Sequence, residues 1–413
     1  MSIKRNSIVI LILTVFFINV NAQNIDTSYK TLESITVVSR NLKITEKASP
    51  YSITKLDQHQ IASSAFRTTP EALMGSNGVF IQKTNHGGGS PFIRGLTGNQ
   101  TLILVDGIRL NNSTFRYGPN QYLNTIDMFT IDKIEVAKGI GAIEYGSDAM
   151  GGVINLSTKE NEYSSRPIVH ASTLGKFISS NMEQTSRSEI SFSNAQLAIQ
   201  GGLSFKNYGN LKGGGNVGIQ NPTGYNENNI DLKVKLKITK QDEVIIATQN
   251  TIQHHVPIYH KIALENYRIN EVEKQARSLN YVKYKHINNN KWFAEFLVTA
   301  STQRTIEQRS LQRNNSTIYR NEADTVHTIG MTSEIISKPT KYWTFNTGFD
   351  YYQDNIYSSA KELNQQTNTT VFKRGLYPNA AKYNNSSVFN LHHFQLGRLF
   401  IETGLRYNFL KIN

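Results

Sequence analysis

The feature that most constrains this chain is a polar–apolar alternation that starts near residue 166 and recurs to the end of the sequence. In IDLKVKLKI, residues 230–238, every second side chain is apolar and those between are Asp or Lys. Residues 195–205, 343–352 and 399–409 repeat the pattern. Successive side chains of a β-strand point to opposite faces, so each segment predicts a strand with one apolar and one polar face.

These segments predict a transmembrane β-barrel. They run for about ten residues, whereas strands of a soluble sandwich, the alternative, usually have about five or six. Short turns (residues 287–291 and 337–342) alternate with a long polar stretch (residues 207–229), as tight periplasmic turns and long outer loops do. We expect four side chains of one strand to face lipid and two to face the lumen: Trp343, Phe345, Phe349 and Tyr351, against Asn346 and Asp350.

Composition narrows the classes of function. The chain has no cysteine, which excludes a disulfide framework, a thiolate metal site and a cysteine nucleophile. Its net charge is +13, but the Lys and Arg residues are scattered and form no basic helix, so we expect no nucleic-acid partner. Lys4 and Arg5 precede an apolar run at residues 7–20, which predicts a signal peptide over residues 1–22. An uncleaved anchor helix is the alternative.

Residues 43–158 mix helix and strand signals and predict a compact α+β domain. Pro70 suits the first turn of a short helix, and residues 101–110 read as an apolar strand broken by an Asp-Gly turn. Three glycines, Gly146, Gly151 and Gly152, come just before residues 153–158. We expect them to let the backbone turn tightly and approach the barrel wall.

No catalytic constellation is visible. The run HGGGS, residues 86–90, lacks the Gly-x-Ser-x-Gly elbow that a hydrolase would need. His254, His255 and His260 suggest a metal cluster, but on a strand His254 and His255 point to opposite faces. The sequence therefore predicts no enzyme, no metal site and no resident cofactor.

Several motifs together carry a resemblance to a known family. They are SPFIRGLTGNQTLILVDGIRLNN, YLNTIDMFTIDKIEVAKGIGAIEYGSDAMGGVINLSTK and the island ITVV. In this order and spacing they resemble the plug domain and energy-coupling box of TonB-dependent outer-membrane receptors. The resemblance covers residues 32–158 specifically and the barrel portion loosely. It implies an α+β plug domain followed by an antiparallel transmembrane β-barrel of the 22-strand type, in the outer membrane of a Gram-negative bacterium.

The resemblance also implies a division of the chain and a mechanism. Residues 1–22 would be the signal peptide, 23–42 a flexible segment with the TonB box, 43–158 the plug, and 159–413 the N-terminal part of the barrel. TonB, driven by its proton-motive-force complex, would pair with the box by β-strand addition. The box residues would be Ile35, Thr36, Val37 and Val38.

Two cations match the positions that lock plug to barrel in this family, Arg94 and Lys138. Most members have Arg where Lys138 stands, and lysine lacks the bidentate fork of arginine. Glu295 and Glu402 are candidate partners in the barrel.

The predicted function is energised uptake of a scarce ligand. The candidate ligand-binding residues lie on apical plug loops: His86, Phe115, Arg116 and Tyr117. Arg116 favours an anionic iron chelate, most simply a ferric siderophore, whereas His86 would suit a haem iron. Haem or haemoglobin, cobalamin and glycan import remain alternatives, as do a plugless porin or adhesin and a secreted binding protein. Outer-membrane lipid is the remaining expected partner.

A barrel of 22 strands needs more residues than follow residue 166. The sequence therefore predicts about half a barrel, in a fragment or a truncated reading frame.

Overall fold

The computed structural model describes residues 35–37, 43–45, 52–83, 85–86, 88–118, 120, 122–139, 142–146 and 148–413. The predicted signal peptide and Val38 of the predicted TonB box lie outside the described residues. Residues 35–413 form one compact unit. Within the described residues, no helix is both long and apolar enough to cross a membrane.

The N-terminal part, residues 52–158, is called the plug here. Its main sheet has five strands in the order β3-β8-β9-β6-β7, in which only the β6–β9 pair is parallel. These strands are Ser52–Leu56 (β3), Thr101–Val105 (β6), Ile108–Arg109 (β7), Ile131–Lys138 (β8) and Gly152–Thr158 (β9). A separate hairpin joins β4 (Val79–Lys83) to β5 (Gly89–Ile93). β6 has the sequence TLILV and is buried at every position, as an unbroken apolar run predicts.

Short helices complete the plug. α2 (Gln58–Ser64) begins with a capping box, in which the Asp57 carboxylate accepts from Gln60 N and the Gln60 amide oxygen accepts from Asp57 N. α3 (Thr69–Ala72) carries Pro70 in its first turn, as predicted. The remaining short elements are α4 (Ala142–Tyr145) and two 3₁₀ turns, η2 (Tyr122–Thr125) and η3 (Met128–Thr130).

The glycines before β9 pack mainly inside the plug, which corrects the expectation that all three approach the barrel wall. A Cβ on Gly152 would come 2.5 Å from the Ala137 carbonyl oxygen, and one on Gly151 would come 2.8 Å from Leu96 Cβ. Only at Gly146, where φ is +99°, would a Cβ meet a residue of the large sheet, at 3.4 Å from Arg406. The glycines therefore serve chiefly to let β9 enter a crowded plug sheet.

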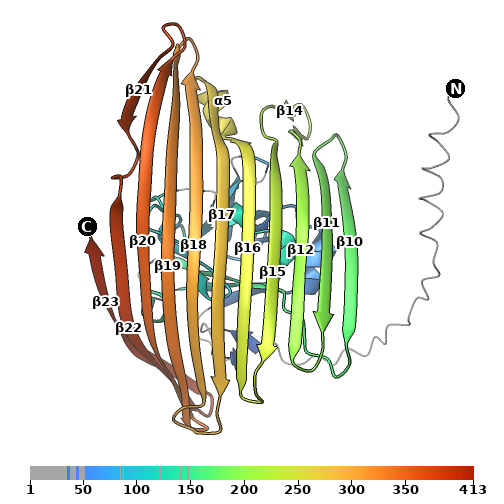
Figure 1. The fold of residues 1–413 in the computed structure, drawn as a ribbon, viewed down its shortest axis with the longest axis vertical. Coiled ribbons are helices and arrows are strands. Elements are labelled where there is room, and N and C mark those ends of the chain that lie inside the picture. Colours follow the sequence, from blue (N-terminus) through green and yellow to red (C-terminus); the bar gives the residue numbers. More distant parts are fainter. Residues whose placement is uncertain are drawn as a thin grey trace, which may run out of the picture. The chain divides into compact units, whose positions relative to one another are not determined.

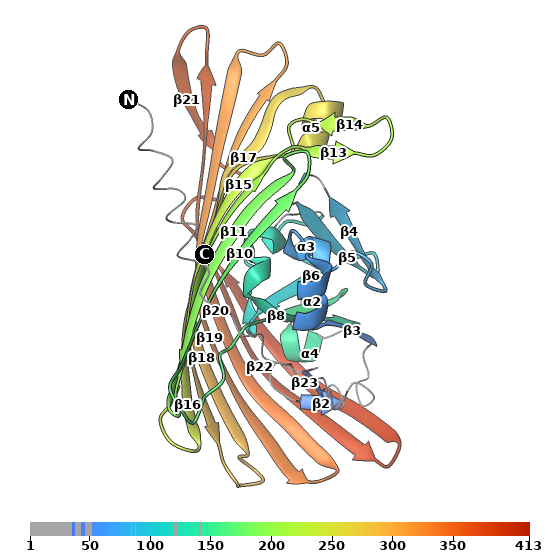
Figure 2. The ribbon, with the colours of Figure 1, turned by 90° about the vertical axis from the view of Figure 1, so that its right-hand side faces the viewer.

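The large antiparallel sheet, called the wall, follows the plug. Eleven of its strands pair with one another in chain order, from β10 to β23, and a twelfth, β21, pairs with β20. They are Ile168–Ile178 (β10), Glu183–Ser193 (β11), Leu197–Tyr208 (β12), Tyr225–Lys237 (β15), Asp242–Pro257 (β16), Tyr267–Ile287 (β17), Glu295–Arg313 (β18), Ile318–Thr340 (β19), Trp343–Asn364 (β20), Thr369–Arg374 (β21), Ala381–Leu396 (β22) and Leu399–Ile412 (β23). Figure 1 shows them side by side, and Figure 2 shows that the sheet curves around the plug.

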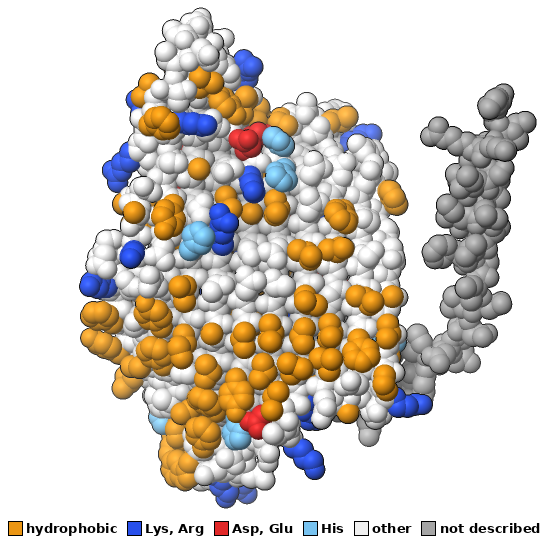
Figure 3. All heavy atoms as spheres, in the orientation of Figure 1, with side chains coloured by type: hydrophobic (Ala, Val, Ile, Leu, Met, Phe, Trp, Pro, Cys, Tyr) orange, Lys and Arg blue, Asp and Glu red, His pale blue; other side chains and the backbone are white. Residues whose placement is uncertain are grey.

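The two faces of the wall differ as the alternation predicts. On β20, Asn346 and Asp350 face the plug and are 0% and 2% exposed, whereas Phe349 points away from it and is 37% exposed. Figure 3 shows the face turned away from the plug, where hydrophobic side chains form a belt across the lower part of the strands. The prediction of one polar and one apolar face is confirmed on β20, and β12 and β15 show the same alternation of buried and exposed side chains.

The two ends of the wall differ as well. One end carries tight turns, among them residues 238–241 and 341–342. The other end carries residues 209–224, with the small hairpin β13 (Leu211–Gly213) and β14 (Gly218–Gln220), and also α5 (Tyr259–Leu264). We call the end with the long connections the outer end.

Candidate functional site: the plug–wall interface and the outer cavity

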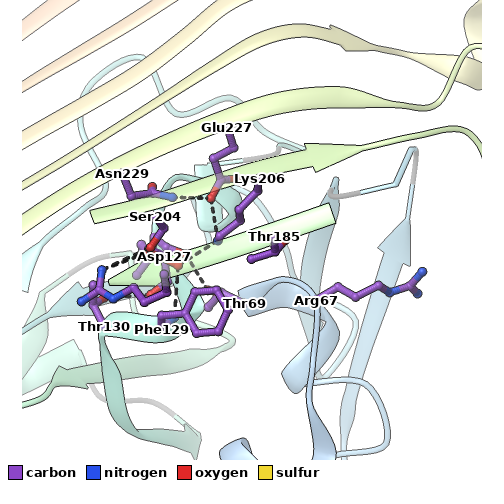
Figure 4. Close-up of polar contacts among 12 residues, drawn as sticks. Arg67, Thr69, Asp127, Phe129, Thr130, Thr185, Ser204, Lys206, Glu227 and Asn229 are labelled. Atoms are coloured by element: carbon purple, nitrogen blue, oxygen red, sulfur yellow. Dashed lines mark hydrogen bonds and ion pairs between the residues drawn. The ribbon is translucent and has the colours of Figure 1, made fainter. Parts of the chain in front are cut away.

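A buried charge cluster joins the plug to the first strands of the wall. Asp127, which caps η3, accepts from Lys206 Nζ at 2.8 Å and from Ser204 Oγ at 2.6 Å (Figure 4). Lys206 also donates to Glu227 at 2.7 Å. Burial opposes ionisation of Asp127, but the charges of Lys206 and Arg187 outweigh it and lower the pKa of the carboxyl. Alternate residues of β12 and β15 supply the wall's side of this cluster.

A second cluster centres on Asp106, in the Asp-Gly turn between β6 and β7. Its carboxylate accepts from the backbone N of Thr158 at 2.8 Å and from Tyr281 Oη at 2.9 Å, and Lys233 Nζ lies 3.4 Å away. Burial would raise the pKa of Asp106, but the ammonium groups of Lys233 and Lys283 lower it to about 2. Asp106 has φ +52°, which the predicted tight turn requires.

Other wall side chains bond to plug backbone. Arg277 Nε donates to the Thr125 carbonyl oxygen at 3.1 Å, and Gln253 Nε2 donates to that of Asn124 at 3.0 Å. At the far strand, Arg406 donates to the carbonyl oxygen of Glu144 at 3.0 Å. Each contact gives a backbone carbonyl oxygen of the plug a hydrogen-bond donor from the wall.

The cations predicted to lock plug to barrel are placed elsewhere. Arg94 is exposed in the turn after β5. Lys138 bonds within the plug, donating to the Asn77 carbonyl oxygen at 2.7 Å and to Thr54 Oγ1 at 2.9 Å. The two candidate partners pair inside the wall: Glu295 lies 3.0 Å from Lys338, and Glu402 lies 3.1 Å from His393. The structure thus brings neither cation to either glutamate.

The ligand candidates separate into two groups. Arg116 and Tyr117 line a cavity of about 430 Å³ near the outer end, together with residues of α5 and of β17 and β18. Arg116 lies 3.0 Å from Glu307, and Tyr117 is 79% exposed. Burial would lower the pKa of Arg116, but Glu307 raises it, so the guanidinium stays charged. Other residues that line this cavity include His260, Lys261, Tyr267 and Arg309.

His86 and Phe115 do not line this cavity. His86 is 0% exposed; its Nδ1 lies 3.1 Å from the Gly209 carbonyl oxygen, and its ring lies 4.7 Å from that of Tyr208. Burial lowers its pKa to about 4, so the imidazole is neutral at pH 7. Phe115 is buried and stacks on Tyr122 at 4.2 Å. In this arrangement both residues anchor apical plug loops.

The three histidines considered for a metal are spread out. His254 is on β16, His255 has φ +55° and lies 3.1 Å from Glu271, and His260 is in α5. In the part of the chain that the structure describes, no group of three or more His, Asp or Glu side chains is placed to hold a metal ion.

Three of the four predicted TonB-box residues, Ile35, Thr36 and Val37, form a short strand. β1 (Ile35–Val37) pairs antiparallel with β2 (Lys43–Thr45), with Ile35 opposite Thr45 and Val37 opposite Lys43. The predicted strand character of residues 35–37 is therefore present in the backbone.

Fold and interface define a class: a plug domain seated against the inner face of a membrane-barrel wall. Residues 45–153 match the TonB-dependent receptor plug domain family. The chain is 30% identical over 154 residues to the vitamin B12 transporter BtuB of Vibrio vulnificus, covering 37% of this chain and 23% of that protein. It is 34% identical over 142 residues to the iron-regulated outer membrane virulence protein of Vibrio cholerae, covering 32% and 21%.

The fold agrees with these matches. The copper transporter OprC superposes with a TM-score of 0.69 at 13% identity, over 86% of this chain and 55% of that one. The chain thus spans about half the length of this solved structure, and its matches cover less than a quarter of the two curated relatives. Over residues 45–153 the chain carries the plug domain of TonB-dependent receptors, and its wall has the fold of part of the barrel seen in this solved structure.

Sequence reasoning missed the residues that join plug to wall. The sequence predicts Asp106 only as a turn residue and Lys233 only as part of a polar strand face, and it does not single out Asp127 or Lys206. One signal in the sequence could have found them. Lysines on the lumen face of a strand become buried when a plug fills the lumen, and a buried lysine needs a carboxylate partner opposite it.

Proposed function

We propose that this chain is part of a receptor that binds an anionic iron chelate, of the ferric siderophore type, at the outer face and imports it with energy from TonB. The observation that carries this proposal is the cationic and aromatic lining of the outer cavity. Its size, about 430 Å³, is that of a small-molecule site.

The cavity chemistry favours an anion with flat groups. Arg116, Lys261 and Arg309 line it. Each of the three is paired with a carboxylate: Arg116 with Glu307, Lys261 with Glu265 and Arg309 with Asp324. Arginine offers several fixed donors to carboxylate or catecholate oxygens, and Tyr117 and Tyr267 offer flat rings for packing. Because Arg116 already pairs with Glu307, an anionic ligand would have to compete for this guanidinium or bind beside it.

A corrinoid is the second candidate, since the vitamin B12 transporters are among the relatives of 30–34% identity. Haem has less support through His86, because that imidazole is buried against Gly209 and Tyr208. His260 is the histidine at the cavity, so a haem ligand would have to use it.

Binding to receptor-bearing outer membranes separates these ligands. Arg116→Ala should weaken ferric siderophore binding by about tenfold or more, the loss of a charge-assisted hydrogen bond. The matched control is Arg268→Ala, an exposed cation on β17 outside the cavity lining, which should bind as the parent does. Tight cobalamin binding with no chelate binding would replace the proposal by the corrinoid, and haem binding abolished by His260→Gln would replace it by haem.

Energy coupling has its own test. Val37→Pro removes a backbone donor and fixes φ in the predicted box, so strand addition with TonB should fail. We expect radio-iron uptake to collapse while ligand binding at the outer face persists. Uptake at the parent level in Val37→Pro would place the coupling segment elsewhere.

A further inference from the structure

The loop between α3 and β4 contains the only Asn-Gly pair of the sequence, Asn77 and Gly78. The two residues lie at the centre of a tight turn, in which Val79 N donates to the Ser76 carbonyl oxygen at 3.1 Å. Gly78 has φ +73°, a value that favours glycine. A Cβ at this position would lie 3.1 Å from Cδ of Lys138, so the stem of the lysine packs over the glycine.

The side-chain amide of Asn77 and the backbone N–H of Gly78 are both unengaged. The Asn77 side chain is exposed, and no hydrogen bond is recorded for its amide within the described residues. The N–H of Gly78 likewise donates to no described backbone group. Because Gly78 has no Cβ to shield its nitrogen, this nitrogen can approach Cγ of Asn77 when the turn rotates about its backbone bonds.

A buried ammonium group lies on the carbonyl group of the same peptide unit. Lys138 is 8% exposed, and its Nζ donates to the Asn77 carbonyl oxygen at 2.7 Å and to Thr54 Oγ1 at 2.9 Å. The Asn77 carbonyl and the Gly78 nitrogen are conjugated in one peptide bond, so negative charge that develops on the nitrogen spreads to this oxygen. A charge-assisted hydrogen bond to the oxygen stabilises that charge. Lys138 therefore makes the N–H of Gly78 more acidic.

We propose that Asn77 is a site of spontaneous deamidation in the folded plug. The Gly78 nitrogen gives up its proton and attacks Asn77 Cγ. A bond from the nitrogen to Cγ forms, the bond from Cγ to the amide nitrogen breaks, and ammonia leaves with the proton. Water then opens the cyclic succinimide at one of its two carbonyl carbons, adding its hydroxyl group to the carbon and its proton to the ring nitrogen. The products are aspartate and isoaspartate at position 77.

Lys138 favours the isoaspartate product. Isoaspartate forms when water attacks the former main-chain carbonyl carbon of Asn77, whose oxygen accepts from Lys138. That carbonyl group becomes a carboxylate next to the ammonium, and the main chain then runs through the former side chain. β4 begins at Val79 and Thr54 lies on β3, so the longer main chain acts on two plug strands that Lys138 holds together. Chelate binding and uptake take no part in the reaction, so this inference is independent of the proposed function.

The test follows Asn77 in the receptor purified in detergent and kept in warm, mildly alkaline buffer. Samples are denatured and cleaved with trypsin, and the peptide of residues 68–83 contains Asn77 as its only asparagine. Chromatography with mass spectrometry separates its asparagine, aspartate and isoaspartate forms, and a zero-time sample corrects for conversion during digestion. We expect Asn77 to convert at least as fast in the folded receptor as in the receptor unfolded in guanidinium chloride, with isoaspartate as the main product.

Variants separate the contribution of the ammonium group from that of the Asn-Gly pair. Lys138→Met should slow the conversion about tenfold in the folded receptor, the loss of one charge-assisted hydrogen bond, and should not change it in guanidinium chloride. Thr54→Val is the matched control: it removes the other partner of Lys138 and should change the folded rate less than about twofold. Gly78→Ala should slow the conversion in both states, because its Cβ shields the nitrogen.

Either of two results overturns the inference. One is a conversion of Asn77 that is slower by about tenfold or more in the folded parent than in the unfolded parent. The other is an equal folded rate in the parent and in Lys138→Met. The first comparison needs no variant, so it remains decisive if Lys138→Met fails to assemble. Failure of the receptor to bind an iron chelate would leave both results unchanged.

Discussion

The core of the plug and its contact with the wall are built from opposite chemistry. The plug core is a cluster of buried aliphatic side chains from β6, β8 and β9, such as Ile103, Ile134 and Ile154. Among the described residues, the wall members of this buried cluster lie on β16 and β17, at positions such as Ile245 and Leu279. The ion pairs and hydrogen bonds of the contact are centred on Asp106 and Asp127.

The difference separates folding of the plug from its docking. The free energy of apolar burial is lost when the core opens, because water does not replace the contacts between aliphatic side chains. A hydrogen bond or ion pair can be exchanged for bonds to water, so its net contribution is small while both partners remain. A plug with this interface can stay folded while its contacts with the wall are exchanged. Removing one partner of a buried ion pair leaves the other charge buried and unpaired. We expect this change to give the largest loss of stability.

Lys206→Met should be the most damaging single change at the interface. It leaves the carboxylates of Asp127 and Glu227 buried without their shared cation, which typically costs about 3–5 kcal/mol. The chain has no cysteine, so a fluorophore on exposed Met74→Cys reports plug unfolding or release specifically. We expect release at a much lower urea concentration than in the parent. Phe205→Leu, on the opposite face of the same strand, is the control, and equal midpoints for both variants would contradict the cluster's role.

Ile154→Ala tests the other side of the comparison. Ile154 is fully buried at the centre of β9, so truncation should destabilise the plug by about 3 kcal/mol through lost burial and a cavity. Limited proteolysis should then cut within the plug, whereas Lys206→Met should release a plug that still resists cleavage. Met74→Ala, at an exposed site, should change stability by less than about 0.5 kcal/mol. Identical cleavage patterns for the core and interface variants would remove the distinction drawn here.

The two faces of the wall give a third comparison. Phe349 lies six residues along β20 from Trp343, which is ~20 Å of strand and near the middle of the apolar band. Phe349→Arg should therefore cost about 2–4 kcal/mol and reduce assembly in the membrane. Phe349→Leu keeps the apolar character and should assemble normally, as judged by the folded band on unheated gels. Normal assembly of Phe349→Arg would argue that this face does not meet lipid.

The sequence was informative where local rules decide the structure. Alternation in residues 343–352 predicted which side chains of β20 face the plug, and the Asp-Gly turn at Asp106 forms with positive φ as expected. The capping box of α2 is equally local, since Asp57 and Gln60 satisfy each other.

The contacts between plug and wall join residues that are distant in the chain, so they could not be predicted from the sequence. Asp127 and Lys206 lie far apart in the chain and meet only through the register of β12 and the docked position of η3. The same reason explains His86: an exposed loop histidine and one buried under residue 209 look identical in sequence. Motif positions identified Arg94 and Lys138 as candidate locks, but their surroundings depend on turns that a motif does not specify.

Acid should weaken the contact between plug and wall, and it should not change the loss of stability that Ile154→Ala causes in the plug core. The pKa of Asp106 is about 2 in the folded protein, because Lys233 and Lys283 outweigh its burial, and its ordinary value is 3.8. Because the folded pKa is the lower one, ionised Asp106 stabilises the docked plug above about pH 4, and this contribution is lost as the pH falls through 2. A shift of nearly two units corresponds to about 2 kcal/mol.

The difference in urea midpoint between the parent and Asp106→Asn should therefore shrink toward zero between pH 4 and pH 2. The deficit of Ile154→Ala, which involves no titrating group, should be the same at both ends of that range. If the Asp106→Asn difference instead stays constant with pH, the carboxylate contributes by shape and hydrogen bonding alone, and charge does not hold the plug at this point.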